Sequence, residues 1–251
     1  MNTNALPFGI GAILLGAAGI WFHDFAMQWQ PVPADFPLRM QFAIVTGLLL
    51  ILGGGETLSG RWAHGGAALL AAIYALWVLI LHVPLIVAKP ADLGTWNGVA
   101  EIVMMIAGAI ALYTGVRDAR SRVAAAVCVA TGLCALVFGA THVKYVQFTA
   151  TMVPAWIPPS QIFWAYVTGI GHVAAGLALL SGFHARLGAT LLAVMMAVFV
   201  LLVHIPRVYA SPGELLEWIM LGVALSLSGA AWLVREYATS PATLTRAKLA
   251  S

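Results

Sequence analysis

Eight continuous apolar runs, each about 20 residues long, most strongly limit what this chain can fold into. A transmembrane helix needs roughly 20 consecutive apolar residues to cross the hydrocarbon layer of a bilayer. The strands of a membrane β-barrel would instead be about 10 residues long and would alternate in polarity. Hydrophobic residues make up 62% of the 251 residues and charged residues 8%, whereas soluble domains carry about 25% charged residues. The sequence therefore predicts an all-α, polytopic membrane protein in a lipid bilayer.

Short breaks rich in Pro, Gly, Ser and charged residues separate these runs. Residues 1–6 carry no Lys or Arg, so we expect the first run to remain as a helix and not to be cleaved as a signal peptide. The expected helices are residues 7–27, 40–59, 65–88, 97–115, 123–146, 161–181, 187–207 and 214–234.

One segment of the chain is repeated. Residues 46–84 match residues 168–206 without a gap, and 17 of the 39 aligned positions are identical. A match at a fixed spacing indicates two copies of one structural unit. We therefore expect two four-helix repeats, residues 1–117 and 118–238, and a polar tail at 239–251. Because four is an even number, both repeats enter the membrane from the same side and run parallel.

Charge distribution predicts the orientation. Eight of the 12 Lys and Arg residues lie in the even-numbered breaks and the C-terminal tail, including Arg117, Arg120, Arg246 and Lys248. Cytoplasmic loops are enriched in these residues, so both termini are expected in the cytoplasm. Trp29 is among the residues expected in an aromatic belt at the outer interface. The net charge of +3 is not gathered in one basic stripe, so no nucleic-acid partner is expected.

Ionisable residues inside the runs lie mostly near the expected outer ends of the helices. Such residues are costly in a bilayer and often mark a functional site. His82 and His204 match across the repeat, and each is followed two residues later by a proline that frees a backbone carbonyl. We expect these two histidines to face each other or a shared cavity across the pseudo-two-fold axis. The other candidate binding residues are His23, His142, Glu101, Glu217, Lys144 and Arg207.

The remaining candidates pair less directly. Glu101 and Glu217 match if the preceding loops differ by six residues, and His23 matches His142 with a gap of two. The glutamates are expected to be hydrogen-bond partners of the histidines. For His172, a bond to the carbonyl four residues back is favoured over membership of a polar network.

Three interpretations of the His/Glu cluster stay open. The groups could be polar contacts that tie helices together. They could bind a metal ion or haem iron, with His82 and His204 as ligands, although the spacing matches no known ligand motif. They could also line a pocket for a small ligand such as a quinone.

Several phrases in the second repeat resemble the DoxX-like family of bacterial membrane proteins. They are residues 142–145, 152–159 and 164–169, and 204–207 followed by Glu217 and Trp218. The resemblance implies a four-helix bundle in the bacterial inner membrane. It also implies a redox setting, because the best-known relatives are small subunits of quinone-linked sulfur oxidation complexes and others accompany redox stress proteins. The first repeat departs from the pattern, because residues 32–37 lack the Trp-Ile-Pro phrase and Leu85 replaces Arg207.

From the residues and the resemblance together we expect an accessory of a redox or respiratory partner protein, with a His/Glu site in the outer leaflet. The alternative is a non-catalytic membrane scaffold or a small-molecule carrier whose His/Glu pairs are structural. A carrier is disfavoured because the polar residues gather near one face. Neither the sequence nor the resemblance assigns an enzymatic reaction.

Overall fold

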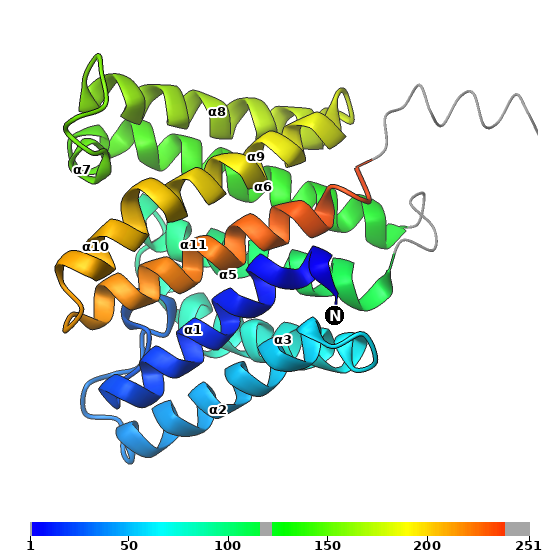
Figure 1. Cartoon of the computed structure of the whole chain (residues 1–251), viewed down its shortest axis with the longest axis vertical. Coiled ribbons are helices and arrows are strands. Elements are labelled where there is room, and N and C mark those ends of the chain that lie inside the picture. The colour runs from blue at the N-terminus through cyan, green and yellow to red at the C-terminus, as the bar shows by residue number, and fades with distance from the viewer. Residues whose placement is uncertain (1, 116–121, 239–251) are drawn as a thin grey trace, which may run out of the picture.

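The computed structural model describes residues 2–115 and 122–238, and its helices run side by side across the molecule (Figure 1). The expected break around residues 117 and 120, the predicted repeat boundary and the tail at 239–251 lie outside the described residues. Within them, eight helices are long and apolar enough to cross a membrane, which confirms the all-α, polytopic membrane fold.

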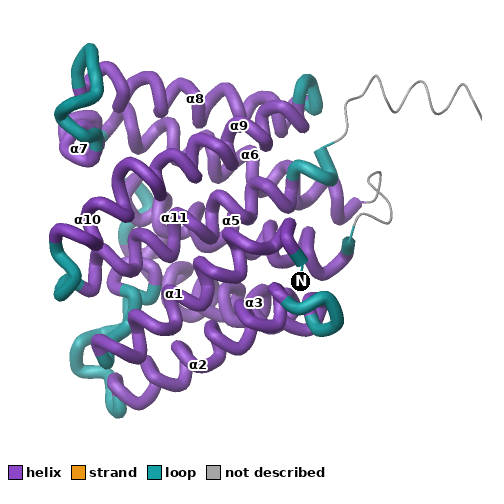
Figure 2. The backbone as a smooth tube through the Cα atoms, in the orientation of Figure 1, coloured by secondary structure: helices purple, strands orange, loops and turns teal. Residues whose placement is uncertain are grey.

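The spanning helices are α1 (Leu6–Phe22, preceded by the short η1, Thr3–Ala5), α2 (Arg39–Leu58), α3 (Ala63–Trp77), α5 (Leu93–Thr114), α6 (Arg122–Lys144), α8 (Gln161–Ser181), α9 (Ala185–Phe199) and α11 (Leu215–Val234). Two of them are prolonged: α3 by η3 (Val78–His82) and α4 (Val83–Ala88), and α9 by η4 (Val200–His204) and α10 (Ile205–Ala210). Two short elements, η2 (Met27–Trp29) and α7 (Val146–Met152), lie in loops between spanning helices. Helix and loop are distinguished in Figure 2.

The first helix is shorter than expected. It ends at Phe22, because His23 adopts a left-handed conformation with a φ of 56° and its N–H bonds the Gly19 carbonyl. Residues 23–38 therefore form a loop that includes η2. The fourth spanning helix, α5, begins four residues earlier than expected, because the Asp92 side chain accepts hydrogen bonds from the N–H groups of Gly94 and Thr95.

Each histidine–proline sequence follows a turn of π-helix. η3 ends at His82 and η4 ends at His204. The N–H of Val83 bonds the Val78 carbonyl, and the N–H of Ile205 bonds the Val200 carbonyl, so each bond spans five residues. A π-helical turn accommodates the missing N–H of the following proline without ending the helix.

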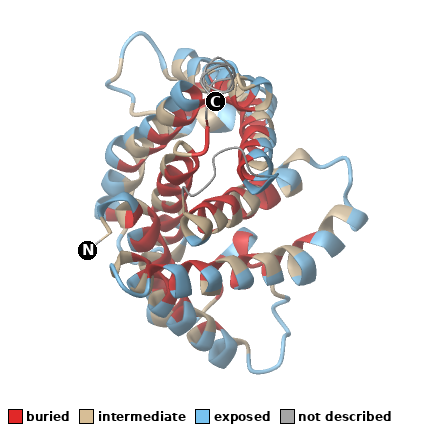
Figure 3. Cartoon of the chain, turned by 90° about the vertical axis from the view of Figure 1, so that its right-hand side faces the viewer, coloured by how far each residue is buried: buried red, intermediate tan, exposed pale blue. Residues whose placement is uncertain are grey.

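Two helices, α5 and α11, lie between the other helices of the two halves: α5 packs against α3 and α6, and α11 packs against α1 and α9. α1 packs against α2 and α11, and α6 packs against α8 and α5. α5 and α11 also pack against each other, and they are the most buried of the spanning helices: 61% of the most apolar part of α5 is buried, and 78% of that of α11. Figure 3 shows the buried residues gathered where helices face one another. Glycines allow these close approaches, since a Cβ on Gly108 of α5 would overlap Ala230 of α11 at 2.5 Å.

Both described ends of the chain lie on one side of the molecule, while α7 and α10 lie on the other (Figure 1). We call the latter side the α7 end.

Candidate functional site

A cavity of about 340 Å³ opens near the α7 end. It lies mainly among helices of the second half of the chain, α6, α7, α8, α9 with η4, and α11, and α5 of the first half supplies one wall. Apolar side chains cover most of it, including Phe138, Phe148, Met152, Met196, Phe199, Met220, Val223 and Leu227. Its polar groups are those of Asn97, Glu101, Thr141, His142, Tyr145, Thr149, Thr168, His172 and His204, with Gln28 and the backbone of Gly94 beside them.

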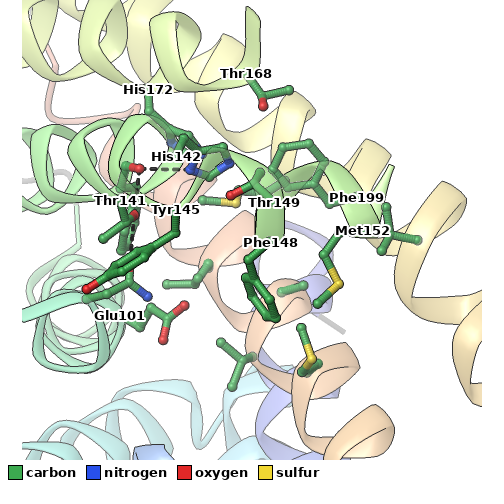
Figure 4. A pocket seen from close by; sticks show the side chains of 18 of the residues that line it. Glu101, Thr141, His142, Tyr145, Phe148, Thr149, Met152, Thr168, His172 and Phe199 are labelled. Carbon is green, nitrogen blue, oxygen red and sulfur yellow. Dashed lines mark hydrogen bonds between the residues drawn. The ribbon is translucent and has the colours of Figure 1, made fainter. Parts of the chain in front are cut away.

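His142 stands on the last turns of α6 and enters the cavity (Figure 4). Its Nδ1 lies 2.8 Å from the carbonyl oxygen of Phe138, four residues earlier. A carbonyl can only accept, so Nδ1 carries the proton of the neutral ring. The helix α8 can pass close by because Gly169 has no side chain: a Cβ there would be 2.9 Å from the Cβ of His142.

His172 of α8 lies beside His142, with ring centroids 4.8 Å apart (Figure 4). It is only 1% exposed, yet its Nδ1 has no hydrogen-bond partner among the described residues. The expected bond to the carbonyl four residues back is therefore wrong. The side chain of Thr168, one turn before His172, points to the preceding turn, since its hydroxyl donates to the carbonyl of Trp164 at 2.8 Å.

His204 reaches the same cavity from η4. Its Nδ1 is also buried without a partner among the described residues. Two residues that line one cavity thus each keep a buried imidazole nitrogen without a partner among the described residues, whereas buried polar atoms in proteins are normally hydrogen-bonded.

Glu101 enters the cavity from the opposite wall, on α5 (Figure 4). The indole Nε1 of Trp29 donates to its Oε2 at 2.5 Å, and Asn97 on the preceding turn also hydrogen-bonds the carboxyl group. Trp29 is 3% exposed, so its expected place in the interfacial aromatic belt is wrong. Trp29 instead connects Glu101 to His82, because its carbonyl oxygen lies 3.1 Å from Nε2 of His82.

His82 is therefore placed apart from His204. It is 2% exposed, its Nε2 is occupied by Trp29, and it is not among the residues that line the cavity. The partner of its imidazole is a backbone carbonyl rather than the expected glutamate, and Glu101 is reached only through the indole of Trp29.

Glu217 has another partner as well. Arg207 donates two hydrogen bonds to its carboxylate, of 2.7 Å from Nε and 2.6 Å from Nη2. Glu217 is 8% exposed. The expected match between Glu101 and Glu217 is not supported by their depth. Glu101 is the ninth residue of α5 and Glu217 the third of α11, a difference of about 9 Å along a helix. Residue 101 corresponds in helix position to Val223, which also lines the cavity.

The remaining predicted residues lie outside the cavity. His23 is exposed at the end of α1, and Lys144 is exposed at the end of α6. The neighbour of His23, Asp24, pairs with Arg39 at 2.6 Å. The match of His23 with His142 also fails by helix position, because His142 lies within α6 and His23 lies beyond the end of α1.

No group of three or more His, Cys, Asp or Glu side chains within the described residues is arranged to hold a metal ion. The cavity instead offers three imidazoles and one carboxyl group around an apolar space.

Some cavity residues were not anticipated from the sequence. Thr141 and Thr168 lie within apolar runs that read as ordinary membrane helices. The helix α7, which supplies Phe148, Thr149 and Met152, lies in a segment too short for a membrane span. Only the family phrase at residues 152–159 pointed to this region.

Residues 125–205 match the DoxX family. The matched stretch is similar to the DoxX domain, and we call it the DoxX domain. It contains His142, His172 and His204, together with most of α6 and all of α7, α8, α9 and η4. The resemblance to the DoxX-like family is thereby confirmed, and the chain is a multi-pass membrane protein that carries most of its cavity inside the DoxX domain. No curated protein and no solved structure matches the chain.

Proposed function

We propose that the cavity of the DoxX domain binds a small, largely apolar aromatic molecule with polar oxygen atoms, such as the head of a lipid-soluble quinone. In this role the protein is an accessory of a redox or respiratory system in the bacterial inner membrane, with both termini in the cytoplasm. The observation that carries the proposal is a cavity of small-molecule size lined by three imidazoles and one carboxyl group, in which the Nδ1 atoms of His172 and His204 have no protein partner among the described residues.

The size and lining of the cavity support this role. Pockets for small molecules measure about 300–1,000 Å³ and combine apolar walls with a few placed polar groups. The cavity has a volume of about 340 Å³, and Phe138, Phe199 and several methionines surround its polar groups. Aromatic and methionine side chains pack well against a planar ring.

A metal or haem site has less support. His82, one of the two expected ligands, already bonds the carbonyl oxygen of Trp29. The described residues form no group of three or more His, Cys, Asp or Glu that could hold a metal ion. Imidazoles in an apolar cavity can instead hydrogen-bond an organic ligand.

We also infer that the chain consists of two parallel repeats of which only the second keeps an open site. Support comes from paired features 122 residues apart: the π-helical turns before Pro84 and Pro206, and the indoles of Trp96 and Trp218, which donate to Pro90 and Pro212. In the first half, Leu50 stands at the position of His172 and is 2% exposed. A leucine side chain cannot hydrogen-bond a ligand, so a single site per chain is expected.

Ligand-induced stabilisation tests the proposal. The purified chain in detergent should melt at a higher temperature with duroquinone or its reduced form, because a ligand at 100 times its Kd stabilises by about 2.7 kcal/mol. His172→Leu, which places the residue of position 50 in the cavity, should abolish the shift. His23→Leu is the matched control, because His23 is exposed and remote from the cavity. Failure of both redox forms to stabilise the wild-type chain would contradict the proposal.

The alternative role, a scaffold whose polar groups are structural, is favoured by one set of contacts. His82, Trp29 and Glu101 are joined to one another, and Arg207 is joined to Glu217. If the protein acts only as a scaffold, His172→Leu should leave co-purification with any membrane partner intact and no ring compound should stabilise the chain.

A further inference from the structure

The polar groups of the cavity have an unequal balance of hydrogen-bond donors and acceptors. Several lining residues have already used their hydrogens on protein oxygens. The hydroxyl of Thr168 donates to Trp164, that of Thr141 donates to Phe138 at 2.7 Å, and the indole of Trp29 donates to Glu101. Tyr145 directs its hydroxyl at Asp92, 3.5 Å away.

His142 has likewise used its one ring hydrogen on a protein oxygen. Its Nδ1–H is directed at the Phe138 carbonyl, so the Nε2 of the neutral ring has a lone pair and no hydrogen. No protein group among the described residues donates to this nitrogen. In Figure 4 the ring stands at the cavity with His172 beside it and Thr168 above it.

The oxygens of Thr141 and Thr168 likewise keep free lone pairs after their hydrogens are used. The Nδ1 atoms of His172 and His204 have no partner among the described residues but are inaccessible, so they do not count among the groups open to a ligand. Thr149 is the one lining hydroxyl for which the described residues provide no fixed acceptor. Around His142, acceptors therefore outnumber free donors. The amide N–H groups of Asn97 and Gln28 lie at the α5 wall of the cavity, where Asn97 hydrogen-bonds Glu101 and the carbonyl oxygen of Gln28 approaches Gly98.

We propose that the cavity selects a ligand that donates hydrogen bonds, and so prefers an aromatic ring with hydroxyl groups, such as a hydroquinone, over the oxidised quinone. The inference rests on the proposed function and specifies the redox form of its ligand. A hydroquinone can donate to His142 Nε2 and to a threonine oxygen while it accepts from the hydroxyl of Thr149. A quinone has only acceptors, so it leaves the lone pairs of His142 and the threonines facing its own oxygens, and each unmet bond weakens binding.

Three forms of one ring provide the test. The full-length chain in detergent at pH 8, without oxygen, is titrated with durohydroquinone, duroquinone and the dimethyl ether of durohydroquinone. Complete ring methylation prevents addition of the thiols of Cys128 and Cys134. We expect durohydroquinone to bind about tenfold more tightly than either of the other forms, which corresponds to the loss of one or two hydrogen bonds.

Two variants locate the effect. His142→Phe keeps an aromatic ring but removes the acceptor, and should bring the affinities for durohydroquinone and duroquinone to within about twofold of each other. Thr168→Val, which has nearly the same shape, should reduce the preference in the same direction, and it replaces His142→Phe if that variant does not fold. His23→Phe is the matched control and should keep the full preference.

The outcomes separate the two proposals. Equal or tighter binding of duroquinone by the wild-type chain overturns the preference for a donor and leaves the proposed ligand site standing. Binding of none of the three rings overturns both. A tenfold preference that persists in both His142→Phe and Thr168→Val also overturns the inference, because the His142 nitrogen and the Thr168 oxygen would then not be its cause.

Discussion

The indole Nε1 of Trp29 donates a 2.5 Å hydrogen bond to Oε2 of Glu101, 72 residues further along the chain. The carbonyl oxygen of Trp29 meets Nε2 of His82 at 3.1 Å. One loop residue thus joins α5 to the end of η3 and satisfies two buried polar side chains. The position of the carboxyl group in the cavity therefore depends on a residue outside the DoxX domain.

Trp29→Phe should destabilise the protein. The substitution keeps an aromatic ring but removes the donor to Glu101, and a buried acceptor that loses its partner costs about 1–3 kcal/mol. Thermal unfolding in detergent measures the change. Trp156→Phe is the matched control, because Trp156 is 73% exposed, and it should have little effect. Similar shifts for both variants would mean that the Trp29–Glu101 bond contributes nothing to stability.

Arg207 and Glu217 should be energetically coupled. Their two hydrogen bonds involve a carboxylate that is largely buried and an arginine side chain that is 35% exposed, so solvent screening reduces the coupling to about 1–2 kcal/mol. A double-mutant cycle with Arg207→Ala and Glu217→Ala measures it by thermal unfolding. The Arg186–Glu236 pair, at 3.6 Å with an arginine 66% exposed, provides the comparison and should couple by less than about 1 kcal/mol. A larger coupling for the second pair would refute the assignment.

Gly229→Ala should separate α1 from α11. A Cβ on Gly229 would overlap the backbone of Phe8, which cannot move without displacing its helix. Overpacking of this kind costs about 1–3 kcal/mol. Gly55→Ala is the matched control, since no atom lies within 4 Å of its Cβ position, and alanine should stabilise the helix by up to about 1 kcal/mol. Stability measurements that rank the two variants in the reverse order would disprove the packing argument.

Asp92 should contribute stability that depends on pH. It lies between the spans, where hydrogen bonds from the side chain and backbone of Thr95 lower the pKa of its carboxyl group. Because the folded-state pKa is the lower one, this stabilisation is present above the unfolded-state pKa and is lost as the pH falls through the folded-state value. Asp92→Asn should therefore flatten the acid side of the stability curve. Unfolding curves of both proteins between pH 3 and 7, superimposable in shape, would rule out this role.

Both termini should be cytoplasmic, because eight of the 12 Lys and Arg residues lie on that side in the predicted topology. A reporter fused after Ser251 should be active in the cytoplasm, and one inserted in the turn at residues 89–92 should be active outside. The reverse pattern would place the α7 end and its cavity at the cytoplasmic face.

Local hydropathy was sufficient to predict the spans but not the loops. The segments predicted at 161–181 and 40–59 nearly coincide with α8 and α2, because crossing a bilayer requires a fixed number of apolar residues. The end of α1 was misplaced because His23 adopts a left-handed conformation that apolarity does not encode. The sequence also indicated that polar residues gather near one end, and the cavity lies at that end.

The sequence by itself determined the class of protein and its eight spans, and it marked the two histidine–proline sequences as points of interest. Only the tertiary structure decided which polar groups meet. His142, His172 and His204 come together from three helices, while His82 is enclosed by Trp29. The reason is physical: inside a bilayer nearly every helix face is apolar, so hydrophobicity does not specify which faces pack together. Close contacts at glycines and the hydrogen bond from Trp29 to Glu101 determine which faces pack together. Both depend on residues far apart in the chain.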